Sequence, residues 1–469
     1  MRRPQSLKTC FPYSVRAPLR APYRGWILGV AAAALLGGCA TSGDRPLPKA
    51  PSTVGSVTRL ERDPEKLDLT PLPKRTVDPA RLAPLDVAIL AVLNNPDLKA
   101  KRAATGVAAA QVFAAGLLPD PQVGITADFP KPGQQAINNY SVGPSLDVGA
   151  LIARAPALKA ARAQRRQADL DLLWAEWGAA QQARILAWTV LADEAKAEAL
   201  AELDRVVGAR AQASRRALAR NDLAAQTTSA DQALALDVQT ALAQARHDAA
   251  QARLDLNALI GLEPQVRLPL VAAPARDWET PALDRARAEL AQRRPDLLAL
   301  QAGYTAEQAN LRKAVLAQFP LQNLGFYAAK DNTGIVSKGL SATFALPIFN
   351  GGRGQIAIEK ATREQLRAEY QARLDQADAE AAADVAERDS AEAQAERLER
   401  ELPSLSDVWT KAQAAWDRND LDAASYLTLA QNLLNKTADL QDRRLAARQA
   451  EIQLETALFI PPAGQEARP

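Results

Sequence analysis

Two periods of hydrophobic and polar positions run along the chain, and the helical one dominates. Helical spacing of apolar residues starts at Leu85 and continues to about Gly116, interrupted at Pro96. Beyond Pro156 it runs almost unbroken to about Ala219, and a further stretch runs from Asp222 to Ile260. At 1.5 Å per residue the last two stretches would measure roughly 90 and 58 Å. Because such lengths exceed the core of a compact domain, the pattern predicts long helices packed side by side.

Short segments of period two lie between the helical stretches. Alternating apolar residues predict strands at about residues 122–129 and 140–148, and again at about 323–329 and 339–348. Each segment is shorter in its alternation than the roughly 9 to 11 residues usual for a membrane-spanning strand. Two interpretations stay open: strand pairs that enter a membrane, and strand pairs that cap a soluble helical body.

The order of elements occurs twice. Pro96-Asp97-Leu98 returns as Pro295-Asp296-Leu297, which is 295 − 96 = 199 residues later. Arg220-Asn221-Asp222-Leu223 returns as Arg418-Asn419-Asp420-Leu421, which is 418 − 220 = 198 residues later. Two markers with one period indicate a duplicated unit. The expected divisions are a first copy at residues 85–263, a proline-rich linker at 264–281, a second copy at 282–460 and a tail at 461–469.

The N-terminus has the order of a signal peptide. Six basic residues precede the apolar run Trp26–Leu36, which would span only about 16 Å as a helix, too short to cross a membrane. Leu36-Gly37-Gly38-Cys39 resembles a bacterial lipoprotein cleavage box, in which Cys39 becomes the acylated first residue. Ala40 in the next position implies sorting to the outer membrane. We therefore expect a signal peptide at residues 1–38 and a proline-rich tether at 39–84; an ordinary signal sequence is the alternative.

The charge balance changes once the leader is set aside. The whole chain has 57 Lys and Arg against 54 Asp and Glu, a formal net charge of +3. Removing the six leader residues leaves 57 − 6 = 51 basic against 54 acidic residues. The basic balance therefore belongs to the leader, and no nucleic-acid partner is expected.

The chain has few residues of the types that usually carry out catalysis. The chain has one histidine, His247, and two cysteines, of which Cys10 lies in the leader and Cys39 in the cleavage box. Gly351-Gly352-Arg353-Gly354 lacks the Gly-Lys-Ser/Thr of a phosphate loop and predicts a tight turn into a helix. Trp174, Trp177 and Trp188 have near-helical spacing, which indicates packing. We expect no catalytic residue, no metal and no cofactor.

The second copy carries a family resemblance. RRPDLLALQAGYTAEQANLRKAVLAQFP (Arg293–Pro320), followed by LPIFNGGRGQIAIEKATREQLRAEY (Leu346–Tyr370), resembles the TolC-type outer-membrane efflux proteins. The first copy shows weaker similarity at Leu93–Ala104 and Asn257–Pro264. The resemblance implies a mainly α fold with a small β part, in which three copies share a 12-stranded outer-membrane β-barrel and an α-helical periplasmic tunnel.

The resemblance also implies a function and partners. Such proteins are passive exit ducts in the Gram-negative outer membrane, with the helical body in the periplasm. They open by contact with a periplasmic adaptor protein and an inner-membrane efflux pump. The competing hypothesis is an elongated periplasmic lipoprotein helical bundle with a structural or adaptor role and no pore, for which the strand pairs would be dispensable.

The turns between long helices are the implied docking sites. In the family these turns meet the adaptor, which singles out Arg220, Asn221, Asp222, Leu223, Arg418, Asn419, Asp420 and Leu421. Asn and Asp also tolerate turn geometry and cap helices, so Asp222 and Asp420 have capping of the following helix as an alternative role. Some relatives narrow the pore with aspartates beyond the second turn. The matching positions here carry Ser425 and Thr428, so this chain departs from that pattern, and the nearby Asp420 and Asp422 are the candidates for a ring of carboxylates.

Overall fold

The computed structural model describes residues 43, 46–67, 71–131, 137–273, 280–418 and 420–462. The chain divides into two units, Met1–Ser52 and Thr53–Pro469, and every element described below belongs to the second. The expected signal peptide and Cys39 lie outside the described residues, as do residues 463–469 of the expected tail.

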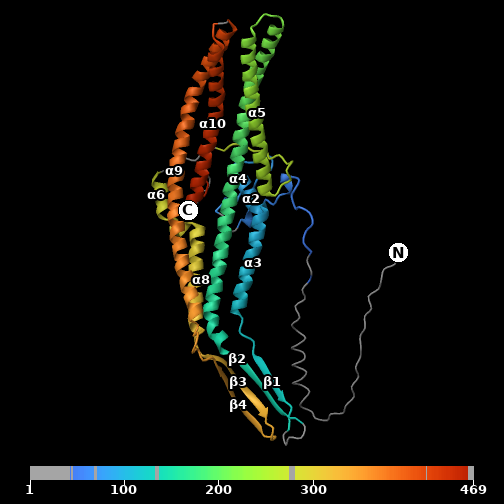
Figure 1. Ribbon diagram of the computed structural model, residues 1–469, viewed down its shortest axis with the longest axis vertical. Helices are drawn as coiled ribbons and strands as arrows, with labels where there is room; N and C mark the ends of the chain where they lie inside the picture. Colours follow the sequence, from blue (N-terminus) through green and yellow to red (C-terminus); the bar gives the residue numbers. More distant parts are fainter. Residues whose placement is uncertain are drawn as a thin grey trace, which may run out of the picture. The chain divides into compact units, whose positions relative to one another are not determined.

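Four long helices form two hairpins, which end near one another at the end opposite the strands (Figure 1). They are α4 (Val148–Ala219), α5 (Ala225–Ile260), α9 (Arg353–Asp417) and α10 (Ala423–Leu458). α4 has 72 residues and α9 has 65, which confirms the prediction of long helices. As in most proteins, packing of the apolar faces against neighbouring helices stabilises them more than intrinsic propensity does.

The predicted start of α4 was wrong. The helix begins at Val148, and Pro156 lies inside it rather than before it. The side chain of Asp147 caps the helix by accepting a hydrogen bond from the backbone N–H of Ala150 at 2.7 Å. Proline removes one backbone hydrogen bond from a helix interior. Pro156 and Ala160, one turn later, are both buried, so packing offsets that loss.

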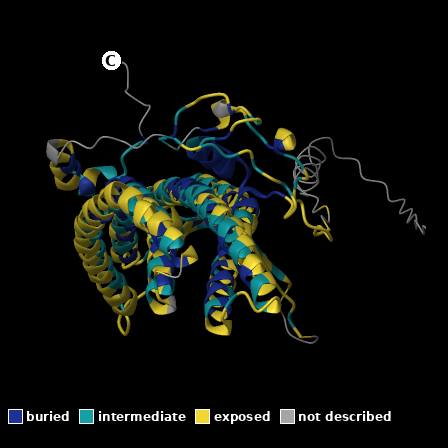
Figure 2. Ribbon diagram, turned by 90° about the horizontal axis from the view of Figure 1, so that it is seen from above, coloured by how far each residue is buried: buried dark blue, intermediate teal, exposed yellow. Residues whose placement is uncertain are grey.

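Shorter helices complete a curved layer. They are α2 (Pro84–Asn94), α3 (Pro96–Gly116), α6 (Thr280–Ala288), α7 (Leu290–Arg293) and α8 (Pro295–Leu316). Near the strands the packing order is α3–α4–α8–α9, and towards the hairpin turns it is α5–α4–α10–α9. Buried residues gather where helices face one another (Figure 2). The layer thus has two lateral edges, formed by α3 and α5 on one side and by α9 on the other.

Among the described residues, none of the helices is both long enough and apolar enough for a membrane span.

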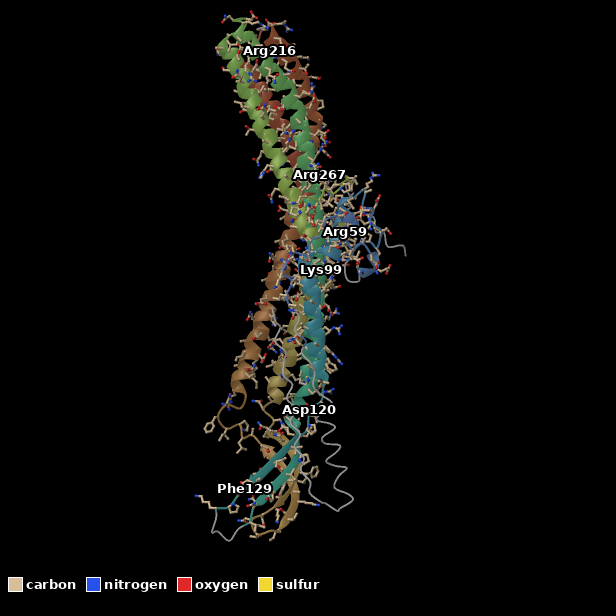
Figure 3. The ribbon with its side chains drawn as sticks, turned by 90° about the vertical axis from the view of Figure 1, so that its right-hand side faces the viewer. Arg59, Lys99, Asp120, Phe129, Arg216 and Arg267 are labelled. Carbon is tan, nitrogen blue, oxygen red and sulfur yellow. The ribbon has the colours of Figure 1, made fainter. Side chains whose placement is uncertain are left out.

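A single antiparallel sheet joins the two copies of the unit. Its strands are β1 (Gln122–Asp128), β2 (Asn139–Asp147), β3 (Leu321–Lys330) and β4 (Val336–Phe344), in the order β1-β2-β3-β4. Both predicted strand pairs are present, and β2 pairs with β3 to unite them. Asp120 lies where α3 gives way to β1, and Phe129 follows the far end of that strand (Figure 3).

The predicted bounds of the last strand were wrong at both ends. β4 starts at Val336 and ends at Phe344, so Leu346 and Ile348 lie outside the strand. Pro347 between them has no N–H to donate to a ladder, which explains why the strand cannot continue. Within the sheet, Tyr327 packs over Gly339 on β4, so closely that a Cβ there would lie 2.8 Å from the ring.

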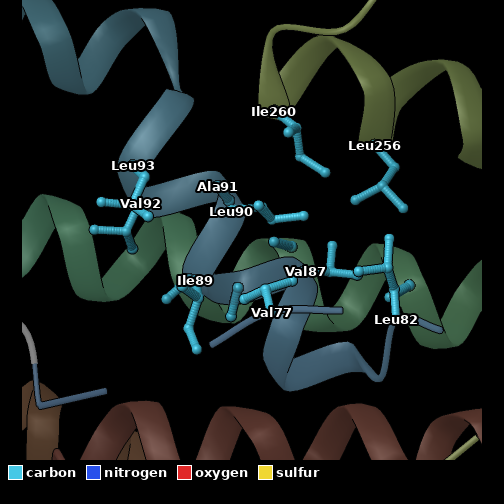
Figure 4. Packing of buried hydrophobic residues seen from close by; sticks show 14 of the residues in the cluster. Val77, Leu82, Val87, Ile89, Leu90, Ala91, Val92, Leu93, Leu256 and Ile260 are labelled. Atoms are coloured by element: carbon cyan, nitrogen blue, oxygen red, sulfur yellow. The ribbon is translucent and has the colours of Figure 1, made fainter. Parts of the chain in front are cut away.

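The largest hydrophobic cluster of the described residues surrounds α2, at mid-height along α4 (Figure 1). Leu82, Val87, Leu90, Leu256 and Ile260 are fully or almost fully buried there (Figure 4). Residues from the proline-rich segment before α2 join this core: Val57, Leu60, Leu67, Leu72 and Val77. The predicted helix over 85–116 is therefore two helices, broken at Asn95 between α2 and α3.

Backbone pairings attach the segment before α2 to the segment that follows α5. Val54 pairs with Leu262 and Leu82 with Leu270 in parallel bridges. Asn94 fixes the same segment, since its side chain accepts from the N–H of Glu61 and donates to the Glu61 carbonyl, both at 2.9 Å. The tether and the start of the linker thus lie against each other.

Candidate docking tips and channel wall

The first tip joins α4 to α5. Asn221 occupies the left-handed region with φ of 60°, a conformation that asparagine tolerates better than most residues. Arg220 Nε donates to Asp222 Oδ2 at 2.9 Å, and the N–H of Asp222 donates to the Ala217 carbonyl at 2.9 Å. Leu223, which completes the tip, is half-buried. The turn therefore combines a backbone hydrogen bond with its own Arg–Asp pair.

The second tip, between α9 and α10, repeats these contacts. Arg418 Nε donates to Asp420 Oδ2 at 3.0 Å, and the N–H of Asp420 donates to the Ala415 carbonyl at 2.9 Å. Asn419 lies outside the described residues. Leu421 packs against the hydrophobic cluster below the tip. Both Arg–Asp pairs are largely exposed, so they stabilise the turn weakly and remain open to a partner.

The capping role expected for Asp222 and Asp420 was wrong. The N-cap of α5 is Ala224, which provides no side-chain hydrogen bond. The N-cap of α10 is Asp422, whose carboxylate accepts from the N–H of Ser425 at 2.9 Å and from its hydroxyl at 2.6 Å. These bonds hold the pKa of Asp422 below its usual value. The carboxylates of Asp222 and Asp420 instead accept hydrogen bonds from Arg220 and Arg418, two residues earlier.

The other constriction candidates lie in the first turns of α10. The Thr428 hydroxyl donates to the Ala424 carbonyl at 2.7 Å, and the Ser425 hydroxyl donates to Asp422. Both hydroxyls are thus engaged within their own helix. The Asp420 side chain is 61% exposed. Asp422, the other charged candidate, is exposed as well.

A charged and aromatic network below the tips joins the two hairpins. Arg210 on α4 donates to Asp231 on α5 at 2.9 Å and to Asp417 on α9 at 2.8 Å. Its guanidinium also lies 4.9 Å from the ring centroid of Tyr426 on α10. Burial raises the pKa of Tyr426, which stacks on Trp416 at 4.6 Å. The sequence analysis missed this cluster, because its members are far apart in the chain.

The other residues noted in the sequence are the tryptophans, the histidine and the glycine-rich turn. Trp177 is fully buried and Trp174 packs against the same core, which confirms their packing role. His247 is exposed on α5. Gly351 and Gly352 have φ of 54° and 69° and lead into α9, which confirms the tight turn. Within the described ranges, no three His, Cys, Asp or Glu side chains are grouped to hold a metal ion.

The sheet and the helical layer both end in open edges. β1 and β4 are the outer strands, each with one partner among the described residues. Apolar side chains on the sheet are exposed, including Ile125 at 77%, Leu340 at 70% and Phe326 at 67%. A water-soluble sheet normally buries one face. This sheet needs another apolar environment for these residues.

A scan against protein-family models and a search of curated proteins both give no match. Among solved structures, the chain is similar to the outer membrane channel CmeC of Campylobacter jejuni: 14% identity, 80% of this chain, 85% of that chain, TM-score 0.68. It is similar to the outer membrane protein VceC of Vibrio cholerae: 18% identity, 79% and 95% coverage, TM-score 0.66. It is also similar to CusC, which forms a transmembrane channel: 20% identity, 79% and 91% coverage, TM-score 0.65.

At these identities the likeness concerns the fold. It covers most of each chain. The chain therefore has the subunit fold of the TolC-type outer-membrane channel proteins.

Proposed function

We propose that the chain is the outer-membrane channel subunit of a tripartite efflux or secretion system. It acts as a passive exit duct that opens by contact with a periplasmic adaptor and an inner-membrane pump. The observation that carries the proposal is the channel-subunit fold, with a sheet and a helical layer that both end in open edges. Open strand edges are not tolerated in lipid, so closure needs further copies.

Three copies would close the sheet. Four strands per chain give 3 × 4 = 12 strands, an even number compatible with a membrane barrel. β1 leads away from the helices and β4 leads back towards them, so β4 of one copy would pair antiparallel with β1 of the next. The expected assembly is a homotrimer surrounded by outer-membrane lipid, with the helices forming the tunnel.

Exposed apolar residues lie at matching heights on the two lateral edges of the helical layer. Near the sheet, Phe113 lies about 5 Å from the end of α3, and Ile358 about 8 Å from the start of α9. Near the tips, Leu236 lies about 17 Å from the start of α5, and Val408 about 14 Å from the end of α9. Contact between adjacent copies would bury both pairs.

Cysteine cross-linking tests this closure. The natural cysteines are Cys10 and Cys39, so no other thiol competes. We expect Leu236→Cys combined with Val408→Cys to form a disulfide between copies under mild oxidation. The matched control combines Leu236→Cys with Ile358→Cys, which are on the same edges at different heights and should not cross-link. Equal cross-linking of both pairs would contradict this arrangement of copies.

Planar-bilayer recording tests the channel itself. The purified mature protein should conduct ions, and its mass in the same preparation should be that of three chains. Deleting residues 122–147 together with 321–344 removes the strands and should abolish conductance. A monomer without conductance would overturn the proposal and favour the helical bundle without a pore.

We propose that the adaptor docks at the two tips. The support is the matching, exposed Arg–Asp pairs at Arg220 and Arg418, placed where the hairpins end. Arg220→Glu with Arg418→Glu should weaken adaptor binding at least tenfold, as measured by interferometry. Arg400→Glu, an exposed reversal elsewhere on α9, is the control and should bind normally. Unchanged binding by the double variant would exclude the tips.

We also propose that carboxylates near the second tip bias the pore towards cations. A threefold ring of Asp420 and Asp422 would concentrate negative charge at the axis, with Ser425 and Thr428 lining the next turn. Asp420→Asn with Asp422→Asn should reduce the cation preference of single channels. If conductance and selectivity both stay the same, the ring does not exist.

Acylation of Cys39 is the proposed anchor to the outer membrane. Its support is the cleavage-box sequence before Cys39 and Ala40 after it. Intact-mass measurement of the membrane-extracted protein should show the added acyl chains and an N-terminus at Cys39. Cys39→Ala should lose both, and a normal acyl mass in that variant would contradict the assignment.

A further inference from the structure

The two faces of the sheet carry different side chains. Residues that pair directly across antiparallel strands point to the same face, so the register assigns each residue to a face. One face carries large apolar side chains: Val123, Ile125, Val142, Leu324, Phe326 and Leu340. The other face carries hydroxyl and amide side chains: Thr126, Ser141, Ser145, Asn323, Ser341 and Thr343. In a membrane sheet, a face of the first kind meets lipid and a face of the second kind meets water.

Two lysines lie on the apolar face, both at the end of the sheet that is far from the helices (Figure 1). Lys330 is the last residue of β3, and Lys338 is the third residue of β4. The register places Lys330 between Tyr140 and Val336, and it pairs Lys338 with Ala328. Both lysine side chains are exposed. The apolar face therefore ends in positive charge at its far edge.

The spacing of the two lysines suits a single anion. Val336 lies directly opposite Lys330, so Lys338, two residues further along β4, is the diagonal neighbour of Lys330. Diagonal neighbours on one face are about 7–8 Å apart, and two ammonium groups on flexible stems can meet at one phosphate across that distance. Tyr140 beside Lys330 combines an apolar ring with a hydroxyl, a combination enriched at membrane–water interfaces. These residues thus mark the level of lipid headgroups.

The acidic residues at this end of the sheet are engaged elsewhere. Asp331, in the turn after β3, accepts hydrogen bonds from the N–H of Thr333 at 2.9 Å, from its hydroxyl at 2.7 Å and from the N–H of Ile335 at 2.9 Å. Asp128 belongs to the polar face. The charge of the two lysines is therefore open to an anion from outside the chain.

We propose that Lys330 and Lys338 bind the phosphate group of an anionic membrane lipid, whose acyl chains lie along the apolar side chains below them. The stems of long basic side chains cover apolar surface while their charged ends reach the headgroup level. The inference rests on the proposed function, because it requires the sheet to lie in a membrane.

A lipid fits this surface better than a second copy of the chain does. The lysines lie on a face of the sheet, whereas a neighbouring copy would pair with the edges at β1 and β4. Lys330 is on β3, which already has a strand on each side. Closure of the sheet by further copies would therefore leave the face with the two lysines directed outwards, with one such pair in each copy.

Fluorescence quenching by brominated lipids tests the inference in the full mature protein. Tyr140→Trp places a reporter beside Lys330, and the signal of the natural tryptophans is subtracted with the parent protein. In vesicles, dibrominated phosphatidic acid should bind at the reporter severalfold more tightly than dibrominated phosphatidylcholine, whose choline group competes for its own phosphate.

Further substitutions in the Tyr140→Trp background identify the source of this preference. Lys330→Gln with Lys338→Gln should abolish it, and Lys330→Arg with Lys338→Arg should keep it, because arginine also binds phosphate. Lys99→Gln is the matched control: it removes an exposed lysine from α3 and should leave the preference unchanged (Figure 3). If the double glutamine variant fails to insert, Lys338→Gln alone replaces it and should weaken the preference.

The possible failures separate this inference from the proposed function. Equal binding of the two brominated lipids, with clear quenching by both, would overturn the inference and leave the sheet in lipid. A preference for the anionic lipid that persists without the lysines would overturn it as well. Absence of quenching by either lipid would contradict the membrane position of the sheet, and the inference together with it.

Discussion

The two copies of the repeated unit fix the junction between their helices with different chemistry. In the first copy, Asn95 precedes α3, donates to the Leu259 carbonyl at 2.9 Å and accepts from the N–H of Leu98 at 2.9 Å. The neutral amide of Asn95 makes both hydrogen bonds, so this junction buries no net charge.

In the second copy, the equivalent residue is Arg294, which is 294 − 95 = 199 positions later. It donates to the Ala457 carbonyl at 3.1 Å, and 457 − 259 = 198 shows that the acceptor is equivalent as well. The guanidinium is fully buried and pairs with Asp296 at 2.8 Å and Glu380 at 3.5 Å. Both side chains donate to the equivalent backbone carbonyl. The contact is neutral in the first copy and part of an ionic network in the second.

The largest expected difference between the copies comes from removing these two residues. Arg294→Ala leaves the carboxylate of Asp296 buried without its main partner and should cost about 3–5 kcal/mol of unfolding free energy. Asn95→Ala loses a cap and one further hydrogen bond and should cost about 1–2 kcal/mol. Urea unfolding of both variants compares them. A smaller loss for Arg294→Ala would mean that the network is not the stronger attachment.

The hydrophobic cores beside these junctions also differ between the two copies. Leu90 is fully buried on the intact helix α2, whereas Leu283 is 7% exposed on α6, which is separated from α7 at Glu289. Leu90→Ala should cost about 4 kcal/mol of unfolding free energy and Leu283→Ala about 2 kcal/mol. The second cost is smaller because α6 and α7, which are separate helices, can move into the cavity that the substitution leaves. Thermal unfolding measures both. Equal costs would show that the break in the helix does not soften the second core.

A pH-dependent contrast is smaller. Burial raises the pKa of Asp193 on α4 and of Asp384 on α9 to about 6 in each case. The stability tied to their protonated forms is present below the ordinary value of 3.8 and is lost as pH rises through about 6. Asp193→Asn and Asp384→Asn should each flatten this decline by about 1 kcal/mol or less, because both groups remain partly solvated.

Melting temperatures between pH 4 and pH 8 check that expectation. The exposed variant Asp407→Asn serves as the control and should follow the wild-type curve. Should the two variants decline with pH as the wild type does, these aspartates would not set the pH dependence in either copy.

The smallest expected difference is at the tips. Asp422 caps α10, and Ala224 at the matching position leaves α5 without a side-chain cap. Asp422→Ala should speed amide exchange in the first turn of α10 severalfold. Ala224→Asp should slow it in α5 and stabilise the protein by about 0.5–1 kcal/mol. The two exchange patterns should thus move towards each other; movement apart would contradict the cap assignment.

Local residues were enough to predict much of the fold. The 3.6-residue period is a property of the sequence itself, so the long helices were predictable, as were both strand pairs and the turn at Gly351–Gly352. The tips were predictable too, because Arg-Asn-Asp-Leu occurs twice. The helix start at Val148 was not predictable, because Pro156 disfavours a helix locally and packing with distant residues keeps this segment helical.

Contacts between distant segments could not be read in the same way. Arg210 meets Asp231, Asp417 and Tyr426 from three other helices, and no spacing along the chain marks the four as neighbours.

The sequence by itself determined which segments are helix, strand and turn, and that the unit occurs twice. Those features depend on side-chain periodicity, proline and glycine, all of which act over a few residues. The tertiary structure alone decided which caps form, which charges are buried together and which edges stay open. These depend on pairs of residues up to several hundred positions apart, whose meeting is set by the packing of whole helices.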